Sequence, residues 1–123
     1  MKLLKCQKCG KIIIALEEGS PSTICCGEDM IELVPRSIDG AIEKHVPIVD
    51  IKDNELNIKV GEVEHPMTEE HYIKFIIIET TKGYMIKNLN PSDKPEAKFI
   101  LAYNEEYINT YAYCNLHGLW NNK

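Results

Sequence analysis

Cysteine and histidine, the residues that most often bind transition metals, are grouped in short segments of this chain. The 123 residues include five cysteines and four histidines. Cys114 and His117 lie three positions apart near the C-terminal end, and Gly118 follows them directly. A thiolate and an imidazole at this spacing can bind one ion, so we interpret the segment as half of a metal site whose other ligands come from elsewhere.

The other four cysteines fall within the first 26 residues. Cys6 and Cys9 form a Cys-x-x-Cys-Gly turn, and Cys25 and Cys26 are adjacent and also precede a glycine. Four thiolates suit tetrahedral iron or zinc, and the sequence does not choose between these metals. A disulfide or a pair of buried cysteines is the alternative, but so short a segment needs a metal or a partner to fold. Because neighbouring side chains diverge, we expect a distorted tetrahedron.

The histidines complete a second set of ligands: His45, His65, His71 and His117, together with Cys114. A lone histidine is more often structural than a ligand. All four histidines, however, lie at edges of predicted strands, and one cysteine is left over from the first cluster. Four imidazoles and one thiolate are too many for tetrahedral zinc and too rich in nitrogen for a sulfur cluster, so the set favours iron with an open sixth position. Blue copper is disfavoured because no methionine follows His117.

Two charged residues directly precede the first histidine of this set, Glu43 and Lys44. Ferrous iron with four neutral imidazoles and one thiolate carries about one positive charge, which favours a small anion at the open position. Lys44 could add a second positive charge there, and Glu43 could be an oxygen ligand of the oxidised metal. An ordinary solvated pair of charged residues is the alternative.

Short β-strands are expected to position these ligands. In a small module at residues 1–36, strands are predicted at 2–5, 11–16 and 30–34, and a linker is predicted at 35–40. Residues 37–123 form the second predicted domain, a β-sandwich with strands at 46–51, 56–63, 72–80, 84–89, 98–103 and 110–114. Thr68 could cap a single helical turn that ends at His71. The predicted fold class is therefore all-β.

Composition excludes several classes of partner. The 19 acidic residues outnumber the 14 basic ones and leave a formal charge of −5, which argues against binding to nucleic acid or to an anionic membrane. No apolar run approaches the ~18 residues of a membrane span, and the first residues lack the apolar region of a signal peptide. A cytoplasmic location is therefore expected, and in that reducing compartment five cysteines in a short chain indicate metal or redox chemistry more than disulfides.

Five motifs along the whole chain together resemble desulfoferrodoxin, the two-iron class of superoxide reductase. They are Cys-x-x-Cys-Gly, Cys-Cys-Gly-Glu, Glu-Lys-His-Val-Pro, Val-Gly-x-Val-x-His-Pro-Met and Tyr-Cys-Asn-Leu-His-Gly-x-Trp. The chain departs from the family pattern at no ligand position. The resemblance implies a desulforedoxin-like module, in which the four early cysteines hold iron or zinc, followed by an immunoglobulin-like β-sandwich. It also implies equatorial ligation by the four histidines and axial ligation by Cys114.

The resemblance further implies a reaction, partners and residue roles. Superoxide is reduced by one electron to hydrogen peroxide at ferrous iron, and no dioxygen forms. Lys44 attracts superoxide and helps to deliver protons, and Glu43 ligates the ferric iron after turnover. A rubredoxin-like donor supplies electrons to a protein that is usually a homodimer. The alternatives are a non-enzymatic electron carrier, a zinc-stabilised binding module and a superoxide dismutase.

Two further residue roles are expected around Cys114. The backbone N–H groups of Asn115 and Leu116 could donate hydrogen bonds to the Cys114 sulfur and so tune its electron donation. Trp120 is expected to pack against the site.

Overall fold

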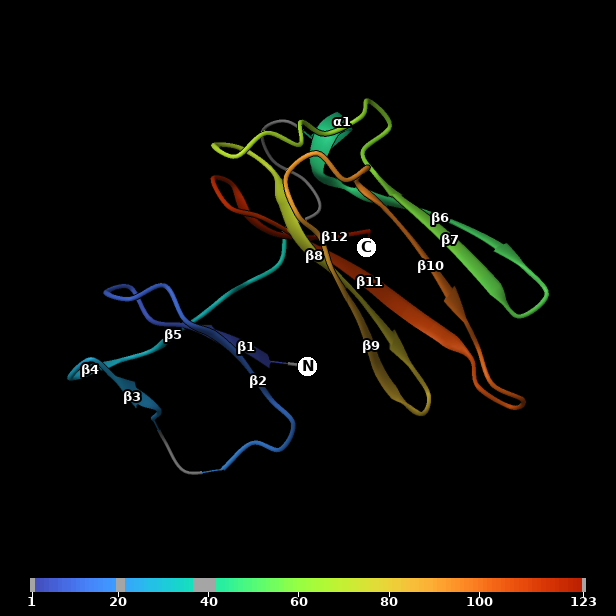
Figure 1. The fold of residues 1–123 in the computed structure, drawn as a ribbon. Coiled ribbons are helices and arrows are strands. Elements are labelled where there is room, and N and C mark those ends of the chain that lie inside the picture. Colours follow the sequence, from blue (N-terminus) through green and yellow to red (C-terminus); the bar gives the residue numbers. More distant parts are fainter. Residues whose placement is uncertain (1, 20–21, 37–41, 123) are drawn as a thin grey trace. The chain divides into compact units, whose positions relative to one another are not determined.

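A computed structural model describes residues 2–19, 22–36 and 42–122 of the chain (Figure 1). The chain divides into two compact units, Met1–Val34 and Pro35–Lys123, which we call the N-terminal unit and the sandwich. Strands make up most of the regular structure of both, which confirms the predicted all-β class. In the part of the chain that the structure describes, no helix has the length and apolar character needed to cross a membrane.

The N-terminal unit contains two small sheets. The larger has the strand order β2-β1-β5 and consists of β1 (Lys2–Lys5), β2 (Ile12–Ala15) and β5 (Ile31–Glu32). The smaller is a hairpin of β3 (Ile24–Cys25) and β4 (Glu28–Asp29), which the sequence analysis did not predict. Strands of two residues are too short to leave an alternation that can be recognised in a sequence.

The sandwich has two antiparallel sheets. The first, in the order β10-β7-β6, consists of β6 (Pro47–Lys52), β7 (Glu55–Val60) and β10 (Glu96–Ile100). The second, in the order β12-β11-β8-β9, consists of β8 (Ile73–Thr80), β9 (Gly83–Asn88), β11 (Tyr107–Cys114) and β12 (Gly118–Asn121). Of these strands, β12 was not predicted.

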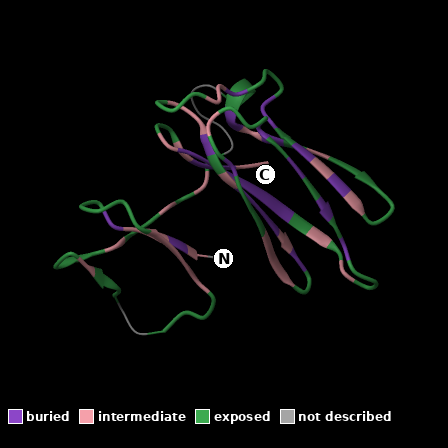
Figure 2. Ribbon diagram, in the orientation of Figure 1, coloured by how far each residue is buried: buried purple, intermediate pink, exposed green. Residues whose placement is uncertain are grey.

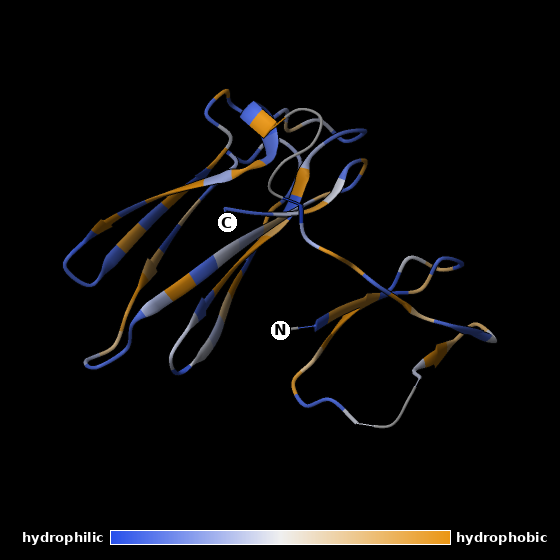
Figure 3. Cartoon of the chain, turned by 180° about the vertical axis from the view of Figure 1, so that it is seen from behind, coloured by the Kyte–Doolittle hydropathy of each residue, from blue (hydrophilic) through white to orange (hydrophobic). Residues whose placement is uncertain are grey.

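The core of the sandwich lies between the two sheets. Side chains from alternate positions point inward, including Leu56 and Ile58 of β7, Ile76 and Ile78 of β8, and Ala112 of β11. This alternation follows from the two-residue repeat of a strand and can be followed along β7 in Figures 2 and 3, whereas β8 and β11 have consecutive buried residues. Cys114, at the end of β11, belongs to the same buried cluster. One of the expected metal ligands is therefore part of the hydrophobic core.

The helical structure differs from the expectation. A single helix, α1 (Ile42–His45), is found among the described residues, at a place where no helix was predicted. The Val46 N–H donates a hydrogen bond to the Ile42 carbonyl at its end. The predicted helical turn at Thr68 is instead a hydrogen-bonded turn in which the His71 N–H meets the Thr68 hydroxyl. The Thr68 side chain accepts a hydrogen bond as a cap would, but residues 68–71 do not form the predicted helical turn.

The predicted linker at 35–40 is described only at its first two residues. The backbone of Arg36 pairs with β12: its N–H donates to the Leu119 carbonyl and its carbonyl accepts from the Asn121 N–H. Residues 37–40 lie outside the described part of the chain. Arg36 thus belongs structurally to the sandwich and covers part of the β12 edge.

Candidate metal centres

The four early cysteines converge at one end of the N-terminal unit. The sulfur atoms of Cys6, Cys9, Cys25 and Cys26 all lie within 4.8 Å of one another. The Cys9 and Cys25 sulfurs are 3.7 Å apart, and those of the adjacent Cys25 and Cys26 are 4.0 Å apart. In a regular tetrahedron of four thiolates about 2.3 Å from one ion, the sulfur atoms are about 3.8 Å apart. The observed distances fit such a centre, with the Cys25 and Cys26 sulfurs slightly farther apart than in the regular geometry.

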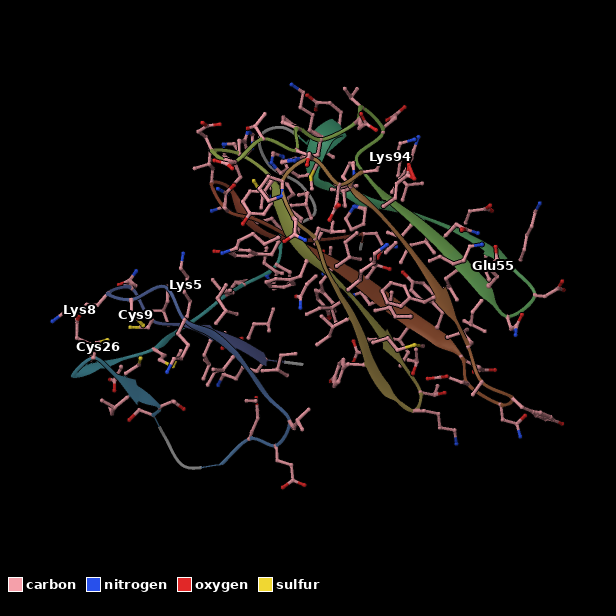
Figure 4. All side chains as sticks on the ribbon, in the orientation of Figure 1. Lys5, Lys8, Cys9, Cys26, Glu55 and Lys94 are labelled. Atoms are coloured by element: carbon pink, nitrogen blue, oxygen red, sulfur yellow. The ribbon has the colours of Figure 1, made fainter. Side chains whose placement is uncertain are left out.

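Local backbone geometry brings these sulfurs together. Gly10, with φ of +83°, closes the first turn by donating its N–H to the Cys6 carbonyl. In the hairpin of β3 and β4, Cys26 and Gly27 have φ of +53° and +77°. Two successive positive φ values are typical of a type I′ turn, and this turn lets adjacent cysteines face one ion. Cys9 and Cys26, labelled in Figure 4, are the exposed members of the cluster.

Hydrogen bonding favours the thiolate form of Cys6 and the protonated form of Cys25. The Cys9 N–H, which lies 3.4 Å from the Cys6 sulfur, lowers the pKa of the Cys6 thiol to about 6. Hydrogen bonds with Cys6 and Cys9 raise the pKa of Cys25 to about 12, because they favour its protonated form. Without a cation, electrostatic repulsion prevents all four cysteines from being thiolates at these distances. A bound cation would stabilise all four.

The four histidine rings form a closed square in the sandwich. Neighbouring ring centroids are 4.6 to 5.0 Å apart, and each neighbouring pair is nearly perpendicular, in the cyclic order His45, His65, His71, His117. Across the diagonal, the centroids of His45 and His71 are 6.4 Å apart. The four histidines, which come from α1, from the connection between β7 and β8 and from the turn after β11, thus surround one point.

The ring nitrogens face the centre of this square. His45 Nε2 lies 3.2 Å from His65 Nε2 and 3.1 Å from His117 Nδ1. Four nitrogens about 2.1 Å from a shared ion in one plane are about 3.0 Å apart along each side, which is close to these values. His117 presents Nδ1 because it shares a tight turn with Cys114, whose sulfur is 3.7 Å from that nitrogen.

Neighbouring groups fix the orientation of two of these rings. His65 Nδ1 lies 2.7 Å from the Pro66 carbonyl, so an Nδ1–H there leaves the Nε2 lone pair for a metal. The indole of Trp120 stacks on His45, with centroids 4.7 Å apart, and its N–H donates to the His117 carbonyl. The prediction that Trp120 packs against the site is therefore confirmed.

Two observations indicate that the square fits a metal cation. The Nε2 atom of His71 is buried and has no hydrogen-bond partner. Burying an unpaired nitrogen costs stability unless its lone pair binds something else, such as a metal ion. Burial lowers the pKa of His65 to about 4, and burial also lowers the pKa of His71. At neutral pH these rings are therefore uncharged, which is the form that binds metals.

Cys114 approaches the square from the core. Its side chain is fully buried, and this burial raises the pKa of the thiol, while the backbone N–H groups of His117 and Leu116 lower it. The contribution of the Leu116 N–H to the pKa of this thiol agrees in direction with the role expected for that group, which stays a prediction. The corresponding expectation for Asn115 is wrong, because its N–H donates to the Tyr72 carbonyl. A tight turn directs the N–H groups of its later residues at the first side chain, which is why His117 takes this place.

Lys44 and Glu43 are both exposed on α1. Lys44 lines a cavity of about 480 Å³ together with His65, and its positive charge contributes to the lowered pKa of His71. The ammonium group is therefore close enough to influence the imidazoles. The Glu43 carbonyl accepts a hydrogen bond from the Val63 N–H, and the role predicted for its carboxylate stays a prediction.

Gly61 holds α1 close to the segment that carries His65, a role that the sequence analysis missed. Its φ is +88°, and a Cβ atom at this position would lie 2.7 Å from the Lys44 carbonyl oxygen and 2.4 Å from that of Val63. No other residue fits there without displacing one of these backbones. The glycine inside the Val-Gly-x-Val motif was the available signal.

The fold and the two clusters define a class of protein: a small four-thiolate module followed by a β-sandwich with an imidazole and thiolate centre. A sequence model described as desulfoferrodoxin matches residues 37–123, and one for the desulfoferrodoxin N-terminal domain matches residues 1–33. The chain belongs to the desulfoferrodoxin family, which confirms the resemblance noted in its motifs.

Individual relatives agree with this assignment. A desulfoferrodoxin homolog of Methanothermobacter thermautotrophicus is 41% identical, and the match covers 97% of this chain and 95% of that protein. The superoxide reductase of Pyrococcus furiosus is 32% identical, over 76% of this chain and 97% of its own. The crystal structure of the superoxide reductase from Treponema pallidum superposes with a TM-score of 0.84 at 32% identity, over 99% of this chain and 96% of the other.

Proposed function

We propose that this protein is a superoxide reductase that converts superoxide to hydrogen peroxide at the histidine square. The reaction consumes one electron and two protons for each superoxide and forms no dioxygen. The square of four imidazoles, with a core thiol on one side, is the observation that carries the proposal. Four imidazoles and one thiolate fill five positions of a six-coordinate ion and leave one for a small anion.

The family and its members support this proposal. Both the Treponema pallidum structure and the Pyrococcus furiosus relative are named superoxide reductases. An electron carrier with a structural histidine site is the second candidate, but no observation favours it specifically. Four converging imidazoles, of which those of His45 and His65 are buried, and a thiol in the core suit a redox-active iron at least as well as a structural ion.

Each ligand residue has a separate part in the proposed reaction. When bound, iron supplies the electron that reduces superoxide. His45, His65, His71 and His117 would hold it through their ring nitrogens. Cys114 would bind it from the core side and donate electron density to it. Lys44 would attract the anion and aid proton delivery through water, and Glu43 would ligate the oxidised metal.

The four-cysteine centre completes the proposal. Cys6, Cys9, Cys25 and Cys26 would hold a second iron, or zinc, in a distorted tetrahedron. A rubredoxin-like donor in the cytoplasm would return the electron spent on superoxide, and the protein would act as a homodimer. The predicted domains at residues 1–36 and 37–123 would correspond to the N-terminal unit and the sandwich, with Pro35 and Arg36 on the sandwich side of the boundary.

Anaerobic titration of the reduced protein with superoxide tests the proposal. One electron from a chemical donor should be consumed for each superoxide, hydrogen peroxide should accumulate, and no dioxygen should evolve. Azide should change the absorption of the oxidised histidine centre because it occupies the open position. Evolved dioxygen would identify a dismutase. An unchanged spectrum with azide, together with no reaction, would support a saturated electron carrier.

Replacing Lys44 by alanine should slow superoxide binding about tenfold at low ionic strength, because a local positive charge steers the anion. Raising the salt concentration should shrink the difference as the charge is screened. The measurement is the second-order rate constant in pulse radiolysis at several ionic strengths. Lys82→Ala is the matched control, since Lys82 lies beyond the opposite end of β8. Equal rate constants for the Lys44 variant and the control would show that Lys44 is only a solvated residue.

A further inference from the structure

The side chain of Asn115 connects two loops that carry metal-ligand candidates. Its Nδ2 donates to the Glu70 carbonyl at 3.0 Å, and its Oδ1 accepts from the Tyr72 N–H at 3.0 Å. Its own N–H donates to the Tyr72 carbonyl at 3.2 Å. One amide side chain therefore spans the residues on either side of His71, from a position directly after Cys114.

His71 has fewer contacts that hold its ring than His45 and His65 have. His45 and His65 are each 2% exposed, and each is held further, by the stacked indole of Trp120 and by the Pro66 carbonyl respectively. His117 is exposed, but it shares one tight turn with Cys114, whose sulfur lies 3.7 Å from its Nδ1. His71 is only partly buried, and its Nε2 has no hydrogen-bond partner.

The segment around His71 has little regular structure of its own. Residues 67–72 lie outside the strands, and the turn between Thr68 and His71 is closed by local hydrogen bonds. Local bonds fix the shape of a turn but do not place it in the sandwich. The Ser92 N–H anchors the start of the segment at the Met67 carbonyl, and the bonds with Asn115, which join residues 43 and 45 positions apart, anchor the residues next to His71.

We propose that Asn115 is a positioning residue that holds His71 in the plane of the histidine square. The proposal extends the metal site of the proposed function and names the group that keeps its fourth imidazole in place. Outer groups that orient a ligand typically change metal affinity by about 10- to 100-fold when they are removed. Without Asn115, His71 would exchange between bound and free orientations, and the site would retain three imidazoles and the thiolate.

Asn115→Ala removes both side-chain contacts and is the first test, with Asn88→Ala as the matched control because Asn88 is exposed at the end of β9. In iron-loaded protein, iron should pass to a chelator about 10- to 100-fold faster in the Asn115 variant. Trp120 is the only tryptophan of the chain and stacks on His45, so recovery of its fluorescence reports iron loss from this site. The ferric electron paramagnetic resonance signal should also change.

A second variant separates positioning from loss of folding. Asn115→Asp keeps the oxygen that accepts from Tyr72 and loses the donor to Glu70, so its iron release should be intermediate. In metal-free protein, the Tyr72 amide hydrogen should exchange faster in Asn115→Ala and stay protected in Asn115→Asp, which keeps its acceptor, while amides in the centre of β8 keep the rates of the natural protein in both variants. Iron release and amide exchange equal to those of Asn88→Ala would overturn the proposal. Neither measurement needs turnover, so absence of superoxide reduction would refute the proposed function alone.

Discussion

Cys114→Ser should abolish the thiolate-to-iron absorption of the histidine centre and lower the rate of superoxide reduction by about a hundredfold or more. Removing a group that merely orients a ligand already costs about 10- to 100-fold, and this substitution removes the ligand itself. Serine is nearly the same size, but its hydroxyl remains protonated at neutral pH and is a poor ligand for this site. The axial donation of electron density is therefore lost, while the square of imidazoles is retained.

The buried environment of Cys114 limits what can replace the lost thiolate in this variant. Its thiol is fully buried in the core cluster, so no water molecule from bulk solvent replaces it easily. The N–H groups of Leu116 and His117, which are oriented to support a negatively charged sulfur, would then face a neutral hydroxyl. A serine hydroxyl in the core also costs about 1–3 kcal/mol of stability if it finds no partner.

Absorption and resonance Raman spectra of the oxidised variant provide the measurement. The absorption of the four-cysteine centre is the internal control, because the substitution lies in the other unit and should leave that spectrum unchanged. Urea unfolding of the metal-free variant shows whether a loss of folding contributes. If the thiolate-to-iron band persisted in Cys114→Ser, the axial assignment would be wrong.

The ligand residues of both centres could be predicted because metal chemistry restricts the choice of residue so strongly. Only nine cysteines and histidines occur in the chain, and they divide into a set of four near the N-terminus and a set of five. Strands such as β8 were also predictable, since runs of isoleucine between turn signals leave few alternatives. The cyclic order of the four rings could not be predicted. It depends on the order of the strands in the sheets, and hydrophobic periodicity does not encode that order.

Features that depend on tertiary contacts were missed. The helix α1 has only four residues, and contacts with Gly61 and Val63 hold it in place more than any helical periodicity. A role was expected only for the backbone N–H of Asn115, whereas its side chain reaches Glu70 and Tyr72. A sequence shows that a residue can form hydrogen bonds, but only the packed structure shows with which partner.

Loss of the metal from the four-cysteine centre should unfold the N-terminal unit and leave the sandwich folded. Among the described residues of this unit, only Leu3 and Cys6 are buried hydrophobic side chains. Full burial of a leucine contributes about 1.5–3 kcal/mol, whereas ordering each residue costs about 1 kcal/mol or more of conformational entropy. Structural zinc in small domains contributes about 10–16 kcal/mol, which is the scale needed here.

Cys9→Ser in the full chain, with a chelator present, tests this dependence on metal. Cys9 is exposed, so its replacement removes a ligand without opening a cavity in a core. Gln7→Ser is the matched control, because Gln7 is exposed in the same turn and is not a candidate ligand. Hydrogen exchange should show that amides of β1 and β2 lose protection only in the Cys9 variant, while those of β8 and β11 keep it.

Superoxide reduction by the same variant, driven by a chemical reductant, should remain within about twofold of the natural protein, since a structural role for the first metal leaves the histidine square intact. Protected amides in β1 and β2 after complete metal removal would contradict the prediction, because two buried side chains could not account for them. A large fall in the superoxide rate at an intact sandwich would instead show that electrons reach the histidine centre through the four-cysteine metal. The two readouts therefore distinguish a module that is folded by its metal from one that also conducts electrons for the reaction.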